Sequence, residues 1–60
     1  MHYWSLKYVQ TYRYNPFART TTFSNGLDEQ TARTEYNRLK SDPTCLRCEL
    51  RYLGEVVEEF

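Results

Sequence analysis

Apolar and polar side chains alternate at the start of the chain. Trp4, Leu6 and Tyr8 stand at every second position, and polar residues lie between them. This two-residue period, in a segment rich in aromatic and β-branched residues, predicts a half-buried strand over residues 3–12.

A turn is expected directly after this strand. Asn15 and Pro16 predict it over residues 13–17, because proline fixes φ and lacks a backbone N–H, and asparagine tolerates turn geometry. The β-branched run that follows predicts a second strand over 18–23, paired with the first as a hairpin.

A helical period then replaces the alternation. The sequence predicts a cap at Ser24 or Asn25 and a helix that Pro43 ends by about Ser41 or Asp42. Its apolar residues are spaced i, i+4 and i+7, which gives a narrow buried stripe with charged residues around it. The stripe consists of Ala32, Tyr36 and Leu39.

The clearest alternation lies over residues 45–52. It predicts a third strand with one buried and one solvated face. The face expected to be buried carries Leu46, Cys48, Leu50 and Tyr52, and the other carries Arg47, Glu49 and Arg51. Gly54 interrupts the pattern, and residues 55–60 either continue this strand or return as a short fourth one.

The expected fold is therefore a single α+β domain over residues 1–60. Its order is β-β-α-β, with one amphipathic helix packed on an antiparallel sheet, and a fourth strand is left open. The predicted core is Trp4, Leu6, Tyr8, Phe23, Ala32, Tyr36, Leu39, Leu46, Cys48, Leu50 and Val56.

Composition narrows the setting of this domain. The chain has 60 residues, and its eight basic and eight acidic residues cancel, so no strong overall field draws it to nucleic acid or to a membrane. No apolar stretch is long enough for a membrane helix, and the N-terminus lacks the features of a signal peptide. We expect a complete cytoplasmic protein with reduced cysteines.

The spacing of Cys45 and Cys48 invites a metal or redox interpretation. In a regular strand, residues three apart point to opposite faces, and His2 is the only histidine available as a third ligand. We therefore expect no metal, no cofactor and no catalytic residue, so the protein is not expected to be an enzyme. Two copies of the chain could still combine their cysteines on one shared metal.

The basic residues suggest one class of partner. Basic side chains on an open sheet face can contact phosphates, and neighbouring aromatic residues can stack on bases. This alternative hypothesis is a small nucleic-acid-binding protein that uses Lys7, Arg13, Arg19, Arg47 and Arg51.

The aromatic residues suggest another class of partner, and this is the leading hypothesis. Ten aromatic residues in 60 exceed what so small a core can bury, and tyrosine and arginine are enriched in protein interfaces. We expect a module that binds a protein, and we also consider a homodimer formed by strand edges or open sheet faces. The expected contact residues are Tyr12, Tyr14, Phe17, Arg47 and Arg51.

In length, aromatic content and the arrangement of one helix on a sheet, the chain resembles small accessory proteins of bacteriophages and mobile elements. The resemblance covers these general features only and transfers no residue. It implies stoichiometric inhibition or modulation of a host enzyme or defence complex.

Overall fold

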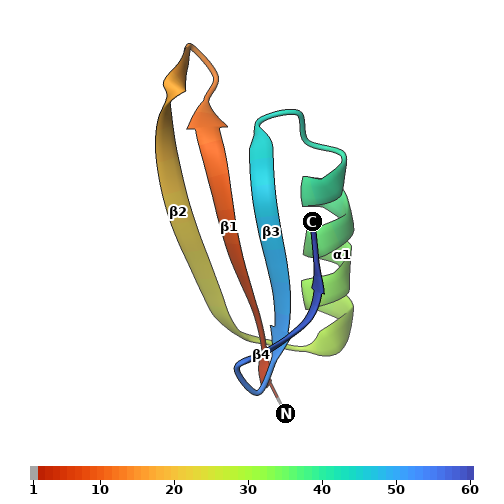
Figure 1. Cartoon of the computed structure of the whole chain (residues 1–60). Coiled ribbons are helices and arrows are strands. Elements are labelled where there is room, and N and C mark those ends of the chain that lie inside the picture. The colour runs from red at the N-terminus through yellow and green to blue at the C-terminus, as the bar shows by residue number, and fades with distance from the viewer. Residues whose placement is uncertain (1) are drawn as a thin grey trace.

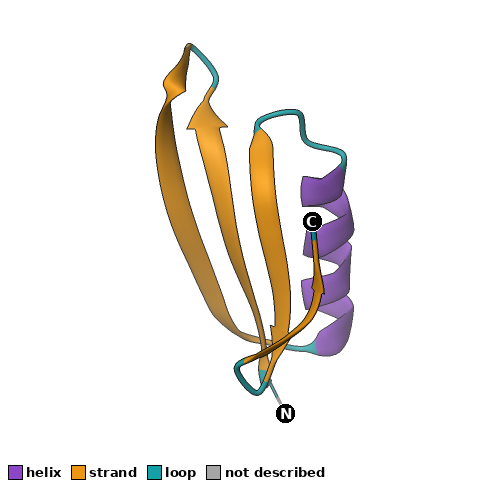
Figure 2. Ribbon diagram, viewed as in Figure 1, coloured by secondary structure: helices purple, strands orange, loops and turns teal. Residues whose placement is uncertain are grey.

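A four-stranded antiparallel sheet with one helix on one of its faces forms the protein (Figure 1 and Figure 2). This computed structural model describes residues 2–60. The elements are β1 (Trp4–Tyr12), β2 (Asn15–Leu27), α1 (Glu29–Lys40), β3 (Cys45–Tyr52) and β4 (Glu55–Glu59). The strand order is β2-β1-β3-β4, which confirms the predicted α+β fold and settles the fourth strand as short but present.

The core lies between α1 and the two central strands. In the register of β1 with β3, Leu6 pairs with Leu50 and Tyr8 with Cys48, so these side chains share the face under the helix. Trp4, Tyr8, Leu27 and Cys45 pack around the core as partly buried residues. The buried core is Leu6, Ala32, Tyr36, Leu39, Cys48 and Leu50.

Three residues of the predicted core are exposed instead, and two of them lie on the face of the sheet opposite the helix. The helix α1 packs over β1 and β3 on the face that carries Leu6, Cys48 and Leu50. Phe23 lies in the uncovered β2 opposite Lys7, on the open face, and is 60% exposed. Val56 lies in β4 opposite Arg51, on the same open face.

A β-bulge explains the third residue, Leu46. Val9 pairs with Arg47 and the next residue, Gln10, pairs with Cys45, so Leu46 has no partner in β1. The extra residue turns Leu46 out of the core to 42% exposure and returns Cys45 to the helix side of the sheet. The prediction that Cys45 and Cys48 point to opposite faces is therefore wrong.

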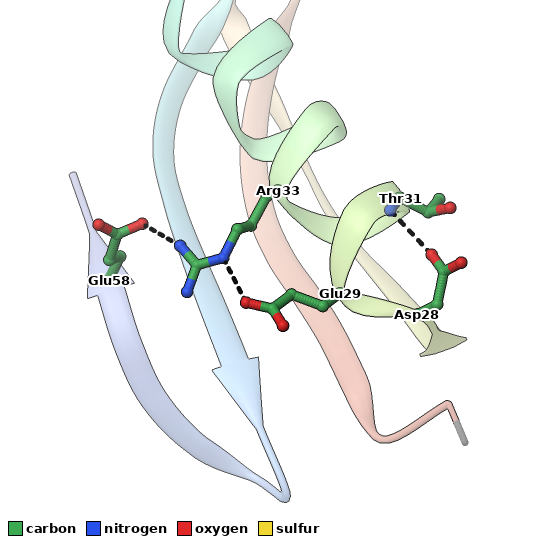
Figure 3. Close-up of polar contacts among 5 residues, drawn as sticks. All are labelled: Asp28, Glu29, Thr31, Arg33 and Glu58. Atoms are coloured by element: carbon green, nitrogen blue, oxygen red, sulfur yellow. Dashed lines mark hydrogen bonds and ion pairs between the residues drawn. The ribbon is translucent and has the colours of Figure 1, made fainter.

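The residue that caps the N-terminus of the helix is Asp28, and not Ser24 or Asn25 as predicted. Its backbone is extended, and its Oδ1 accepts a hydrogen bond of 2.8 Å from the backbone N–H of Thr31 (Figure 3). The strand β2 continues past the expected caps to Leu27 because it stays paired with β1 there. At its other end the helix stops at Lys40, before Pro43, as predicted.

Contacts from α1 hold the short strand β4 in place. Arg33 donates to Glu29 in the same helix at 2.9 Å and to Glu58 of β4 at 3.3 Å (Figure 3). The ring of Phe60, directly after β4, meets Tyr36 edge-on with centroids 5.5 Å apart. The helix thus covers β3 and also fixes the C-terminal hairpin.

Candidate protein-binding site

The hairpin of β1 and β2 extends beyond β3 and α1 and ends in an irregular turn (Figure 1). Tyr12 pairs with Asn15 across the turn, whereas the preceding residue, Thr11, pairs with Arg19. Residues 16–18 therefore have no partner in β1. A proline is tolerated here because a residue outside the ladder needs no N–H donor.

Short-range contacts give this turn a defined shape. The Oδ1 of Asn15 accepts a hydrogen bond from the backbone N–H of Phe17 at 3.2 Å, which is an Asx-type turn. Pro16 between them fixes its own φ. The Arg13 guanidinium lies 5.8 Å from the centre of the Tyr14 ring. The turn is thus ordered without support from the core.

Three aromatic side chains project from this end of the hairpin. Tyr14 is 91% exposed, Phe17 is 93% exposed, and Tyr12 beside them is 55% exposed. We call Tyr12, Tyr14 and Phe17 the aromatic tip. Burying one such side chain is worth about 1.5–3 kcal/mol, and the fold of this chain leaves that free energy unused.

The two arginines predicted to join the aromatic residues do not form one patch with them. Arg47 is exposed on the open face of β3 opposite Val9, about 10 Å along β1 from Tyr12 at roughly 3.4 Å per residue. Arg51 lies opposite Ser5, about 24 Å from Tyr12 by the same measure. Arg47 can therefore flank the tip, and Arg51 cannot.

Arg51 is also occupied within the sheet. It donates to Glu49 at 2.7 Å, and both side chains are about one-third exposed or less. Lys7 lies over the ring of Phe23 at 5.5 Å and faces Glu49 in the strand register, and Glu59 follows on the next strand. Basic and acidic side chains are therefore mixed on the open face, and they alternate along β3 from Arg47 to Arg51.

The residues proposed for nucleic acid are accordingly spread out. Arg13 lies at the turn, and Arg19 lies on the open face of β2 opposite Thr11. Within residues 2–60, no ion pair involves Arg13, Arg19 or Arg47. Glu49 lies between Arg47 and Arg51 along β3, and Thr21 and Phe23 follow Arg19 along β2, so the basic residues form no continuous stripe.

A groove of about 680 Å³ lies beside the tip, between the hairpin and the loop after α1. Gln10 lines the groove and donates to Asp42 Oδ2 at 3.3 Å. Hydrogen bonds from Thr44 hold the pKa of Asp42 below its ordinary value, so this wall of the groove is anionic. Arg13 also lines the groove. Sequence reasoning missed the groove because its two walls are distant in the chain.

Cys45 and Cys48 lie on one face of β3 but do not form a reactive pair. Burial raises the pKa of Cys48 to about 11 and also raises the pKa of Cys45, so both thiols stay protonated at neutral pH. His2 lies beyond the opposite end of β3, where Trp4 pairs with Tyr52. No group of three or more potential metal ligands occurs within residues 2–60.

Comparisons with known proteins leave the function to be inferred from these surfaces. The chain matches no family model, no curated protein and no solved structure. In the part of the chain that the structure describes, no helix is both long and apolar enough to cross a membrane. The fold and site define a small α+β domain with an exposed aromatic hairpin.

Proposed function

We propose that this protein is a binding module that inhibits or modulates a larger host protein by stoichiometric association. The observation that carries the proposal is the aromatic tip, whose Tyr14 and Phe17 are more than nine-tenths exposed on a hairpin that extends beyond the helix. The proposed activity is binding, without catalysis and without a cofactor.

The tip has the physical properties of an interface anchor. An aromatic side chain offers about 150–250 Å² of area for burial, and binding energy in interfaces concentrates on a few such residues in closely packed pockets. The Asn15–Phe17 hydrogen bond and Pro16 already order the backbone. Less conformational entropy is therefore lost when the tip enters a cleft.

Arg13 and Arg47 suit the rim of the same interface. Both are exposed, and neither is tied to an acidic side chain within residues 2–60. Rim charges act mainly on association rate and on the choice of partner. We propose that Tyr14 and Phe17 supply most of the affinity and that these two arginines favour a partner with acidic residues around its binding pocket.

Two observations weigh against the nucleic-acid alternative. The net charge of the chain is zero, and Glu49 and Glu59 interrupt the basic residues of the open face. A protein that neutralises several phosphates loses affinity steeply as salt rises. The salt dependence of binding therefore distinguishes the two functions.

The test is capture of partners by tagged protein from a host lysate, with and without nuclease and at two salt concentrations. Captured proteins are identified by mass spectrometry, and the affinity for the main one is then measured with purified components. A protein retained after nuclease treatment and at the higher salt supports the proposal. Capture that vanishes with nuclease or with modest salt indicates nucleic-acid binding instead.

Single substitutions then locate the contact surface. Tyr14→Ala and Phe17→Ala should each weaken binding about thirtyfold, corresponding to a hot-spot loss of about 2 kcal/mol. Tyr3→Ala is the matched control, because Tyr3 is an exposed aromatic residue at the opposite end of β1. Circular dichroism should show all three variants folded. Unchanged affinity in both tip variants would remove the tip from the interface.

A further inference from the structure

The outer edge of β2 is unpaired along the whole strand. Within residues 2–60, β2 lies at the end of the sheet and pairs only with β1. The helix lies over β1 and β3, so it does not cover this edge either (Figure 1). An uncovered edge of this length offers a row of free backbone donors and acceptors to another strand.

The hydrogen-bond pattern identifies which residues direct their backbone groups outward. The N–H of Thr11 donates to the carbonyl of Thr44 at 2.9 Å. The backbone N–H and C=O groups of the odd-numbered residues of β1 therefore point towards β3, and those of the even-numbered residues point towards β2. Tyr8 therefore exchanges backbone hydrogen bonds with Thr22, its partner in the register of β1 with β2. The backbone groups that face solvent along the edge of β2 belong to Arg19, Thr21 and Phe23.

The two edges of the sheet differ in how they would pair with a copy of themselves. Three of the five residues of β4 are glutamates, and antiparallel pairing about Val57 would set Glu59 against Glu55 of the other copy. Residues 19–23 of β2 contain no acidic residue and a single cation, Arg19. Like charges therefore protect β4 from self-association, and nothing comparable protects β2.

We propose that β2 pairs antiparallel with β2 of a second copy, about a two-fold axis at Thr21. Thr21 then lies opposite Thr21 of the second copy, and Arg19 lies opposite Phe23 of the second copy on the same face. About six backbone hydrogen bonds form, two for each outward-facing pair. The two sheets become one continuous sheet across the dimer.

Cross-strand chemistry favours a second copy as the occupant. Pairing about Thr21 brings no like charges together and sets a guanidinium beside an aromatic ring, a favourable contact. Phe23 already accepts such a contact from Lys7 within its own chain, at 5.5 Å. The β-branched threonines at 20–22 favour extended pairing. Pairing also covers Phe23, which the fold leaves exposed.

The limits of the pairing segment are set by the backbone. Gly26 has a φ of +69°, which departs from strand geometry on one side of the segment. Pro16 and the unpaired residues that follow it end the regular ladder on the other side. The dimer contact is therefore short and confined to residues near 19–23, and the aromatic tips stay outside it.

Sedimentation analysis of the full chain, over a wide concentration range, tests the proposal. The wild type should sediment at twice the monomer mass of 7.3 kDa. Thr21→Lys should weaken dimerisation at least tenfold at low salt, and so should Thr21→Glu, because each sets like charges together at the axis. An equimolar mixture of these two variants should restore the dimer as a heterodimer. Thr21→Val, which keeps the N–H and the shape, should leave it intact.

Thr21→Pro gives a second and independent measurement. It removes an N–H that faces outward, which an edge strand tolerates, so the domain should stay folded and become monomeric. A wild type that remains monomeric at millimolar concentration would overturn the proposal, and so would dimers that persist in all the charged and proline variants. Because the tip lies outside the contact, monomeric variants should still capture the partner protein, which separates this outcome from failure of the proposed function.

Discussion

Replacing Leu50 by alanine is expected to remove a large part of the stability of the domain. Leu50 is fully buried under α1 and is one of the six buried core residues within residues 2–60. Truncating a buried leucine costs about 3–5 kcal/mol, because apolar contacts are lost and a cavity remains. A domain of this length has a total stability of about 3–9 kcal/mol. The midpoint of thermal unfolding should therefore fall by at least about 12 °C.

Leu46→Ala is the matched control, since the same change is made four residues earlier in the same strand. The bulge turns this side chain outward, so its truncation should cost less than about 1 kcal/mol. Both variants are compared with the wild type by urea unfolding at one fixed protein concentration, followed by circular dichroism. Equal losses at the two positions would refute the bulge and the register of β3 with β1.

Three further predictions concern the helix cap, the thiols and the C-terminal ring. Hydrogen bonds from Thr31 lower the pKa of Asp28 below its ordinary value of 3.8, so its stabilising effect is present above that value and is lost as pH falls through the lowered one. The Asp28→Asn variant keeps a capping residue that does not titrate, so its free energy of unfolding should fall less steeply than that of the wild type below about pH 4. Parallel curves of unfolding free energy against pH would contradict this assignment. In the folded protein at pH 8, Cys48 should react with a thiol reagent only as fast as the domain opens, because the residue is buried and burial raises its pKa to about 11. Cys45 should therefore react first, and mass spectrometry gives the order of labelling. Prompt labelling of Cys48 would count against its burial. Phe60→Ala removes the edge-on contact with Tyr36 and should lower the free energy of unfolding by about 1 kcal/mol, as measured by thermal unfolding. An unchanged midpoint would mean that β4 is held by its other contacts.

Local periodicity was sufficient to predict the order of the first four elements, and it left the fourth strand open. Each strand or helix has one apolar face, and the spacing of its apolar residues reports the element directly. The stripe of Ala32, Tyr36 and Leu39 is buried as expected. The aromatic residues at the turn were also predicted from the sequence, because Asn15 and Pro16 mark the turn and no buried periodicity includes their neighbours.

The errors arose where the outcome depends on the whole fold. Nothing near Phe23 reveals which face of β2 lies on the side of the helix. The bulge at Leu46 depends on how Gln10 and Cys45 meet across two strands that are distant in sequence. The cap moved to Asp28 because pairing with β1 extends β2 beyond the expected stop. In each case a tertiary contact overrides a local preference.

Residues close to both ends of the described chain, Trp4 and Phe60, are tied to the sheet. The ring of Trp4 packs against Tyr52 with centroids 4.9 Å apart, and the backbone groups of Phe60 and Cys48 exchange two hydrogen bonds. Trimming is usually best tolerated at termini, but here it would remove part of a central strand or the lock on β4. Residues 13–17 carry no core contact, so insertions and replacements should be accepted there. New binding loops could thus be grafted at the middle of the chain while the domain keeps its stability.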